Sequence, residues 1–293
     1  MQYFAQQAIN AIQLGSIYAL IALGYSMVYG VLVMINFAHG DIFMVGAFVC
    51  LLIVSLCPVT LPFIVILLGV MLITALLGAL IERFAYRPLR NAPRVSAIIT
   101  ALGCGLVIEN TVLSISPYAK PMPVLFKVFT YHVDGITVTT LQLMIIGIAI
   151  FLMLGLDFLV RKTPFGMAMR AISFDTKTVP LMGINVNLMI ALTFAIGAGL
   201  GGAAGMLYGL AYPVISASMG TLVGWKAFVA AVIGGIGDIR GAVLGGFILA
   251  AVEIMTVAFL PSTYRDLISY SLLLVILIFK PYGLLGSAPN QKV

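Results

Sequence analysis

Charged residues are scarce in this chain. Asp, Glu, Lys and Arg make up 8% of its 293 residues, whereas an ordinary globular domain contains about a quarter. Hydrophobic residues make up 62%, and the mean hydropathy is +1.19. This composition excludes a soluble domain. It predicts an integral membrane protein in which apolar runs long enough to cross a bilayer are separated by short charged stretches.

Cysteine and histidine are also rare. The three cysteines, Cys50, Cys57 and Cys104, lie in apolar segments without the spacing of a disulfide framework or a zinc site. We find no nucleophile, base and orienter at a defensible spacing, no phosphate-binding loop and no metal cluster, so we expect neither catalysis nor a cofactor. The start lacks the basic region of a cleavable signal peptide, so we take Met1 as the mature beginning.

The chain contains about nine apolar segments. They cover residues 8–33, 41–57, 61–81, 95–116, 140–160, 187–212, 223–236, 242–260 and 266–279. A helix over 223–236 would span only about 20 Å of a hydrocarbon core that is about 30 Å thick, so we expect it to stop midway or turn back. The fold class predicted is an all-α polytopic membrane protein of about eight to nine transmembrane helices, one of them short or re-entrant, in a single domain over 1–293.

Basic residues predict the orientation. Arginine and lysine gather in 83–94, 161–177 and 280–292, and the positive-inside rule makes these stretches cytoplasmic. The stretch 117–139, with three prolines, is then an external loop. Counting back through three spans places the N-terminus outside. The basic isoelectric point comes from these cytoplasmic stretches, so it gives no reason to expect a nucleic-acid partner.

Two polar, glycine-rich stretches interrupt the apolar sequence. They are INFAHGDIFMVGAF at 35–48 and GGIGDIRGAVLGGF at 234–247. Each contains Gly-Asp-Ile followed by a Gly and a Phe, which predicts an internal repeat. Irregular backbone at membrane depth must be buried in protein or line a wet cavity, and breaks at corresponding positions of two halves mark the pathway in transporters.

Polar residues inside apolar segments are the candidate functional residues, because ionisable groups are rare in membranes. For Asp41 and Asp238 we favour a structural role as helix caps, and for His39 we favour packing. Glu109 and Glu253 fit a helix or subunit interface as well as a pathway. The candidates for the pathway or the helix breaks are Asn36, His39, Gly40, Asp41, Glu109, Gly237, Asp238 and Glu253, and Lys226 and Arg240 are further ionisable groups near them.

Several long stretches together resemble one family. They are LGSIYALIALGYSMVYGVLVMINFAHGDIFMVGAF, YRPLRNAPR, ALTFAIGAGLGGAAGMLYG and GWKAFVAAVIGGIGDIRGAVLGGFILAAVE. The chain is similar over nearly its whole length to the branched-chain amino acid permeases of bacterial ABC importers, LivH-type. The resemblance implies a multi-pass protein of the bacterial inner or cytoplasmic membrane that moves leucine, isoleucine and valine. It also implies a LivM-type permease partner, two cytoplasmic ABC ATPases that hydrolyse the ATP, and an extracytoplasmic amino-acid-binding protein.

The basic loop over about 161–187 has two interpretations. From its residues alone it either sets the membrane topology or docks a soluble partner. Its sequence FGMAMRAISFDTKTVPLMGI resembles the loop that enters a groove of the ATPase in such importers, although Pro180 departs from the family pattern and leaves the extent of the helix open. The resemblance carries ATPase docking onto Gly166, Arg170, Asp175 and Gly183.

Other functions stay open at this stage. Related permeases carry urea, short amides or other amino acids. A stand-alone ion-coupled transporter is a rival of another class, motivated by His39, Asp41, Glu109 and Glu253 in or near apolar segments. A membrane enzyme has the least support.

Overall fold

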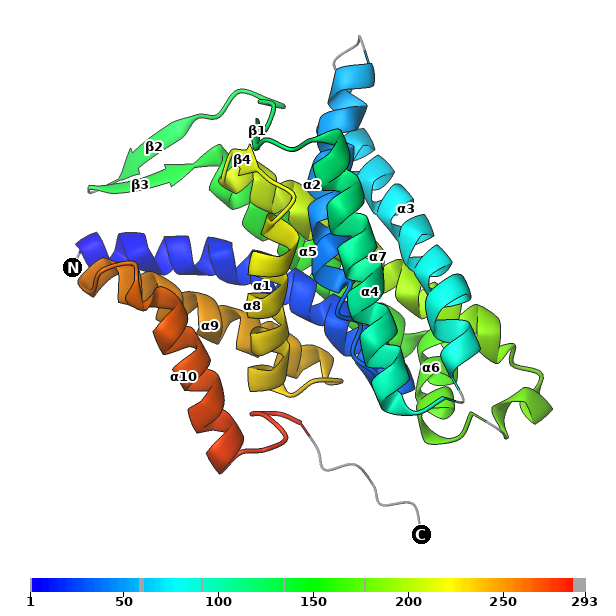
Figure 1. The fold of residues 1–293 in the computed structure, drawn as a ribbon. Helices are drawn as coiled ribbons and strands as arrows, with labels where there is room; N and C mark the ends of the chain where they lie inside the picture. The colour runs from blue at the N-terminus through cyan, green and yellow to red at the C-terminus, as the bar shows by residue number, and fades with distance from the viewer. Residues whose placement is uncertain (1, 58–60, 91, 134, 177, 287–293) are drawn as a thin grey trace.

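Helices dominate the computed structural model, which describes residues 2–57, 61–90, 92–133, 135–176 and 178–286 (Figure 1). The α-helices of the described residues are α1 (Gln2–Leu32), α2 (His39–Leu56), α3 (Phe63–Ile81), α4 (Arg94–Ile115), α5 (Thr140–Lys162), α6 (Pro164–Phe174), α7 (Val186–Ala211), α8 (Met219–Gly234), α9 (Ile239–Phe259) and α10 (Tyr264–Phe279). Shorter elements are the π-helix η1 (Glu82–Tyr86), the 3-10 helices η2 (Arg87–Leu89) and η3 (Val179–Met182), and the strands β1 (Lys120–Pro121), β2 (Thr130–Val133), β3 (Ile136–Thr139) and β4 (Val214–Ile215).

The membrane prediction is confirmed. Among the described residues, seven helices are long and apolar enough to cross a membrane by length and composition, and α8 is a shorter apolar helix. The nine apolar segments correspond to α1–α5 and α7–α10. At 16 residues, α8 extends about 24 Å, which agrees with the half-helix expected from the sequence.

The molecule has two distinct ends. At one, which we name the hairpin end, β2 pairs with β3, β1 pairs with β4, and the Gln6 side chain donates to the Thr137 carbonyl at 3.0 Å. At the other, the basic end, η1, η2 and α6 lie with the start of α9 and the segment 280–286 (Figure 1). The arginine-rich stretches lie at the basic end, and the predicted external loop lies at the hairpin end. The positive-inside rule therefore predicts that the basic end is cytoplasmic.

The helices form an inverted internal repeat. Helix α1 packs along α9, and α3 packs along α7. When α1, α2 and α3 are exchanged with α7, α8 and α9, the contact of α1 with α9 becomes the contact of α7 with α3, so both halves pack in the same way. Helix α1 begins at the hairpin end, and α7 begins at the basic end, so the two units run in opposite directions through the molecule (Figure 1). This arrangement is known from transporters whose ligand sites lie where the repeats meet.

The stretches that correspond in the repeat differ from those predicted. Residues 35–48 match residues 215–228, ISASMGTLVGWKAF, which share with them Ile at the first position, Gly at the sixth and Ala-Phe at the end. Helices α2 and α8 begin alike, after Ala38 (φ −70°, ψ −4°) and Ser218 (φ −74°, ψ −10°). The predicted counterpart of Gly40 was Gly237, but Gly237 has φ +97° and precedes α9, whereas Gly40 is helical.

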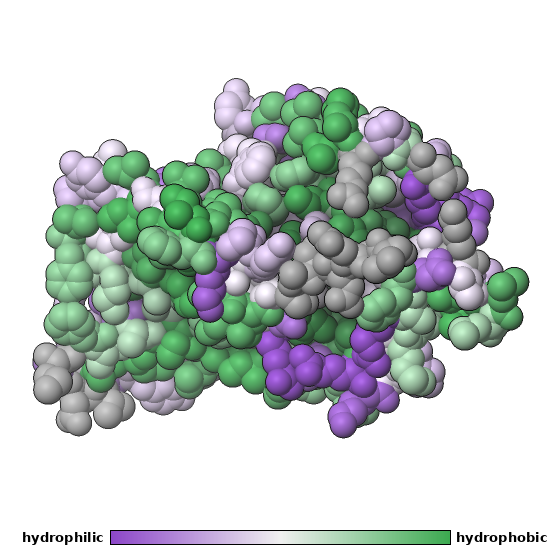
Figure 2. Space-filling model, turned by 90° about the horizontal axis from the view of Figure 1, so that it is seen from below, coloured by the Kyte–Doolittle hydropathy of each residue, from purple (hydrophilic) through white to green (hydrophobic). Residues whose placement is uncertain are grey.

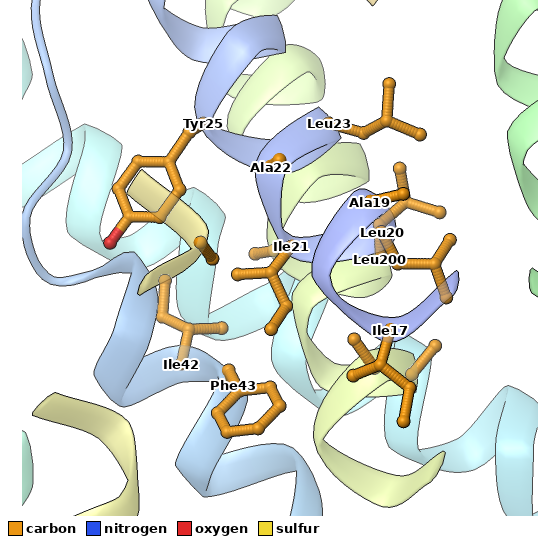
Figure 3. Close-up of a cluster of buried hydrophobic side chains, with 14 of the residues drawn as sticks. Ile17, Ala19, Leu20, Ile21, Ala22, Leu23, Tyr25, Ile42, Phe43 and Leu200 are labelled. Carbon is orange, nitrogen blue, oxygen red and sulfur yellow. The ribbon is translucent and has the colours of Figure 1, made fainter. Parts of the chain in front are cut away.

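The core surrounds the middle of α1. Residues Ile17 and 19–23 are fully buried, and Figure 3 shows their side chains among Ile42 and Phe43 of α2 and Leu200 of α7. Small residues let the other helices approach closely, as at Gly46, where an added Cβ would meet the backbone of Gly202. A central helix enclosed in this way holds α2 and α8 in position around it.

Candidate functional site

A pocket lies where the first turns of α2 and α8 meet beside α4. It encloses about 560 Å³ of empty space, part of it open to the surroundings. Tyr25, Phe37 and Trp225 contribute aromatic side chains, and α4 contributes Leu102 and Leu106. We name it the α2–α8 pocket.

Glycines bring the two first turns into contact. A Cβ on Gly40 would lie 2.9 Å from the Gly224 Cα, and a Cβ on Gly220 would lie 2.9 Å from the Gly40 carbonyl oxygen. Real Cβ atoms do not approach backbone so closely, so only glycine permits this contact. Two helix N-termini, each carrying the partial positive charge of its helix dipole, are thereby placed side by side at the pocket.

Asp41 lies in the first turn of α2 and lines the pocket. The sequence predicted a carboxylate that caps the helix and meets its dipole. The side-chain cap is wrong, because the N-cap is Ala38 and no side-chain capping bond forms, but Asp41 does lie in the first turn, at the positive end of the dipole. Asp41 is 7% exposed, and among the described residues its Oδ1 atom has no hydrogen-bond partner. A Cβ on Gly105 of α4 would collide with the other carboxylate oxygen. The Asp41 carboxylate thus occupies the space between α2, α4 and α8.

Glu109 reaches the same pocket from α4. The hydroxyl of Thr221 in α8 donates to the Glu109 carboxylate at 3.2 Å, and Glu109 lines the pocket together with Asp41. The structure therefore brings together Gly40, Asp41 and Glu109 of the predicted residues. Sequence reasoning missed Thr221 and Trp225, although the match of 35–48 with 215–228 was a signal that could have found them.

Asn36 and His39 support the pocket from behind. Asn36 is buried, and its side-chain oxygen accepts from the Tyr86 hydroxyl at 3.1 Å. The His39 ring lies edge-on to Tyr25, with ring centroids 4.8 Å apart, and fills the space beside Gly24. Neither side chain lines the pocket, so both hold the first turn of α2 in place.

Glu253 lies elsewhere, in a buried ionic cluster. Its carboxylate accepts from the Tyr18 hydroxyl at 3.0 Å and pairs with Arg265 at 2.5 Å and Lys226 at 3.1 Å. Lys226 also pairs with Asp266 at 2.6 Å. Two cations balance two anions, and the cluster joins α1, α8, α9 and α10. Of the two interpretations, the structure places Glu253 at a helix interface.

Gly237 and Asp238 lie at the basic end, away from the pocket. The Asp238 side chain accepts from the Gly241 N–H at 2.7 Å, so the predicted helix cap is confirmed for α9. Gly237 has φ +97°, and a Cβ built on it would lie 3.7 Å from the Gly30 Cα at the end of α1. The Arg240 side chain is exposed.

The predicted docking loop contains α6 and η3. The Thr163 hydroxyl caps α6 by accepting from the Gly166 N–H at 3.4 Å. A Cβ on Gly166 would collide with the Val160 backbone, and the Arg170 guanidinium donates to the Val160 carbonyl. These contacts fix α6 against the end of α5.

After α6 the loop turns sharply. Asp175 is the C-cap residue, and its carboxylate accepts from the Thr178 hydroxyl. Pro180 lies in the first turn of η3, where a missing N–H costs little, and Gly183 ends η3 with φ +79°. The helix therefore ends at Phe174, which settles the extent that Pro180 left open.

Large apolar side chains of this loop are exposed. Met167 is 60% exposed, Phe174 66%, Leu181 85% and Met182 74%. Figure 2 looks onto this end of the molecule, where hydrophilic patches alternate with apolar areas. Exposed apolar patches are typical of surfaces that bind another protein or a membrane.

The comparisons with known proteins agree over nearly the full chain. The family model described as "Branched-chain amino acid transport system / permease component" matches residues 7–277. The chain is 40% identical to the high-affinity branched-chain amino acid transport system permease protein LivH of Salmonella typhimurium, over 99% of this chain and 98% of that protein. It is 38% identical to BraD of Pseudomonas aeruginosa over the same shares.

A related permease of a second type matches in part. The chain is 30% identical to the probable branched-chain amino acid transport permease protein LivM of Methanocaldococcus jannaschii, over 44% of this chain and 41% of that protein. No solved structure matches the chain. The family model and the full-length relatives show that the chain belongs to the family of permease components of branched-chain amino acid transport systems.

Proposed function

We propose that this chain is a transmembrane subunit of an ATP-driven, binding-protein-dependent importer of leucine, isoleucine and valine in a bacterial inner membrane. The observation that carries the proposal is the identity of about 40% to LivH proteins from end to end. Those relatives are named as permease proteins of high-affinity branched-chain amino acid transport. The subunit itself performs no chemistry, and ATP hydrolysis belongs to partner subunits.

The proposed translocation pathway passes the α2–α8 pocket. Polar groups and two helix N-termini meet there inside an otherwise apolar bundle, as the passage of a zwitterion requires. Glu109 is partly exposed on α4, and a carboxylate facing lipid costs about 2.5–3.5 kcal/mol on insertion scales. We therefore assign the open side of the pocket to a second, LivM-type permease.

The proposed ATPase contact is the surface of α6 and η3. Its exposed apolar side chains suit a groove on a soluble subunit, and the contacts of Gly166 and Arg170 with Val160 join α6 rigidly to α5. ATP binding on the partner subunits would favour one of two packings of the helices, and this link would transmit the preference to the pathway.

Copurification tests the assembly. We would express a tagged copy of the chain with the products of neighbouring genes, purify it from membranes and identify the associated proteins. The proposal predicts a second permease and two ATPases, and a binding protein that recognises leucine. A chain purified alone that takes up solute with an ion gradient would replace the importer with an ion-coupled transporter. A binding protein that recognises urea or an amide would correct the cargo.

A further inference from the structure

We propose that the α2–α8 pocket binds an amino acid with an aliphatic side chain and holds its ammonium group between the carboxylates of Asp41 and Glu109. The inference rests on the function proposed above and deepens it by naming the groups that recognise the cargo inside the permease.

The first observation is the unpartnered oxygen of Asp41. The residue is 93% buried, its Oδ1 atom has no partner among the described residues, and it lines the pocket. A buried carboxylate oxygen without a partner is costly, and a ligand that donates to it removes that cost. No described basic side chain lines the pocket. Lys226 of α8 is engaged by Glu253 and Asp266 instead.

The second observation is the carboxylate of Glu109 on the facing helix. Glu109 and Asp41 line the same pocket, so two carboxylates make the pocket attractive to a cation. The described residues contain no group of three or more His, Cys, Asp or Glu that could hold a metal ion. Apart from Thr221 and the glycines, the remaining lining residues are apolar or aromatic, among them Leu102, Leu106 and Trp225. Two carboxylates beside an apolar wall suit an ammonium that carries an aliphatic tail.

The start of α8 supplies the complement for the carboxylate of the ligand. Gly220 and Thr221 belong to the first turn of this 16-residue helix and line the pocket. The N-cap Ser218 makes no side-chain capping bond. Free first-turn N–H groups and the positive end of the helix dipole favour a carboxylate. Both charged ends of an amino acid are therefore matched within one pocket.

Trp225 offers a direct readout, because it is the only tryptophan of the chain and lines the pocket. The intact importer complex in lipid nanodiscs would be titrated with L-leucine, 3-methylbutylamine and 4-methyl-2-oxopentanoate. The Trp225 signal is the difference in tryptophan fluorescence between the complex that contains this chain and the complex that contains its Trp225→Phe variant. The amino acid and the amine should change it, whereas the oxo acid, which lacks the ammonium, should not. An equal response to the oxo acid, or no response to leucine or the amine, would overturn the inference.

Variants test the same point through uptake. Asp41→Asn and Glu109→Gln should each raise the KM for ATP-driven leucine uptake at least about tenfold, because a hydrogen bond to a charged group contributes about 1.5–3 kcal/mol. The control is Asp157→Asn, whose carboxylate pairs with Arg161 on α5. Should Asp41→Asn fail to assemble, Glu109→Gln decides alone. Leucine uptake with unchanged KM in the variants contradicts only the ammonium site, whereas a parent complex that imports no leucine contradicts the proposed function. In that case the amine titration still decides the ammonium site.

Discussion

Gly40 in the first turn of α2 lies directly on Gly220 in the first turn of α8, so that each glycine excludes a side chain on the other. These two residues occupy the same position in the two halves of the inverted repeat. The contact joins the halves at the pocket, and its geometry depends on the absence of both Cβ atoms.

Alanine at this contact should destabilise the protein. Gly40→Ala and Gly220→Ala each place a Cβ against backbone that cannot move aside, and such overpacking costs about 1–3 kcal/mol. Thermal unfolding of the purified protein should show a lower midpoint for both, together with slower leucine uptake. Gly147→Ala is the matched control, because an added Cβ there meets nothing within 4 Å. A midpoint for both variants equal to that of the control would contradict the close contact.

Loss of the Glu253 carboxylate should be severe. Glu253→Ala leaves Lys226 and Arg265 without their buried partner, and breaking a buried ion pair costs about 3–5 kcal/mol. We expect a strong decrease in the thermal midpoint and in the yield of folded protein. Asp266→Asn should cost much less, because that side chain is 60% exposed. Equal effects of the two substitutions would show that the cluster does not hold α8, α9 and α10 together.

Substitutions at the docking surface should reduce ATPase binding without changing membrane insertion. Arg170→Ala removes the bond to the Val160 carbonyl, and we expect less ATPase to copurify while the amount of permease in the membrane stays the same. Replacement of Asp175, which accepts from Thr178, should act in the same direction. Lys162→Ala is the control on the same loop. Normal ATPase recovery and normal uptake in both loop variants would remove the docking assignment.

The orientation can be measured with single cysteines. After the three native cysteines are replaced by serine, Tyr118→Cys and Leu181→Cys place thiols at residues that are 82% and 85% exposed at opposite ends of the molecule. A membrane-impermeant thiol reagent added to spheroplasts should label position 118 and leave position 181 unlabelled. The reverse pattern would invert the predicted topology.

Sequence alone predicted the helices well, because apolar length is a local property. It predicted the short helix α8 for the same reason, and the Asp238 cap because capping depends on a few adjacent residues. The predicted cap at Asp41 was wrong, since the helix begins two residues before it and the side chain turns to a pocket formed by distant helices.

Relationships between distant segments could not be read in the same way. The Gly-Asp-Ile triplet suggested that 234–247 repeats 35–48, but the structural counterpart, 215–228, shares few residues with 35–48 beyond its glycine and Ala-Phe. Backbone geometry is retained there while the side chains differ. The partners of Glu253 come from three other helices. Such pairing depends on packing that periodicity does not report.

The most direct test of the proposed function is ATP-driven leucine uptake into proteoliposomes that contain the purified complex and its binding protein. The proposal predicts accumulation of leucine that requires ATP on the ATPase side and binding protein on the other, with no uptake by the permease chain alone. Uptake by this chain alone, driven by an ion gradient and independent of ATP, would contradict it.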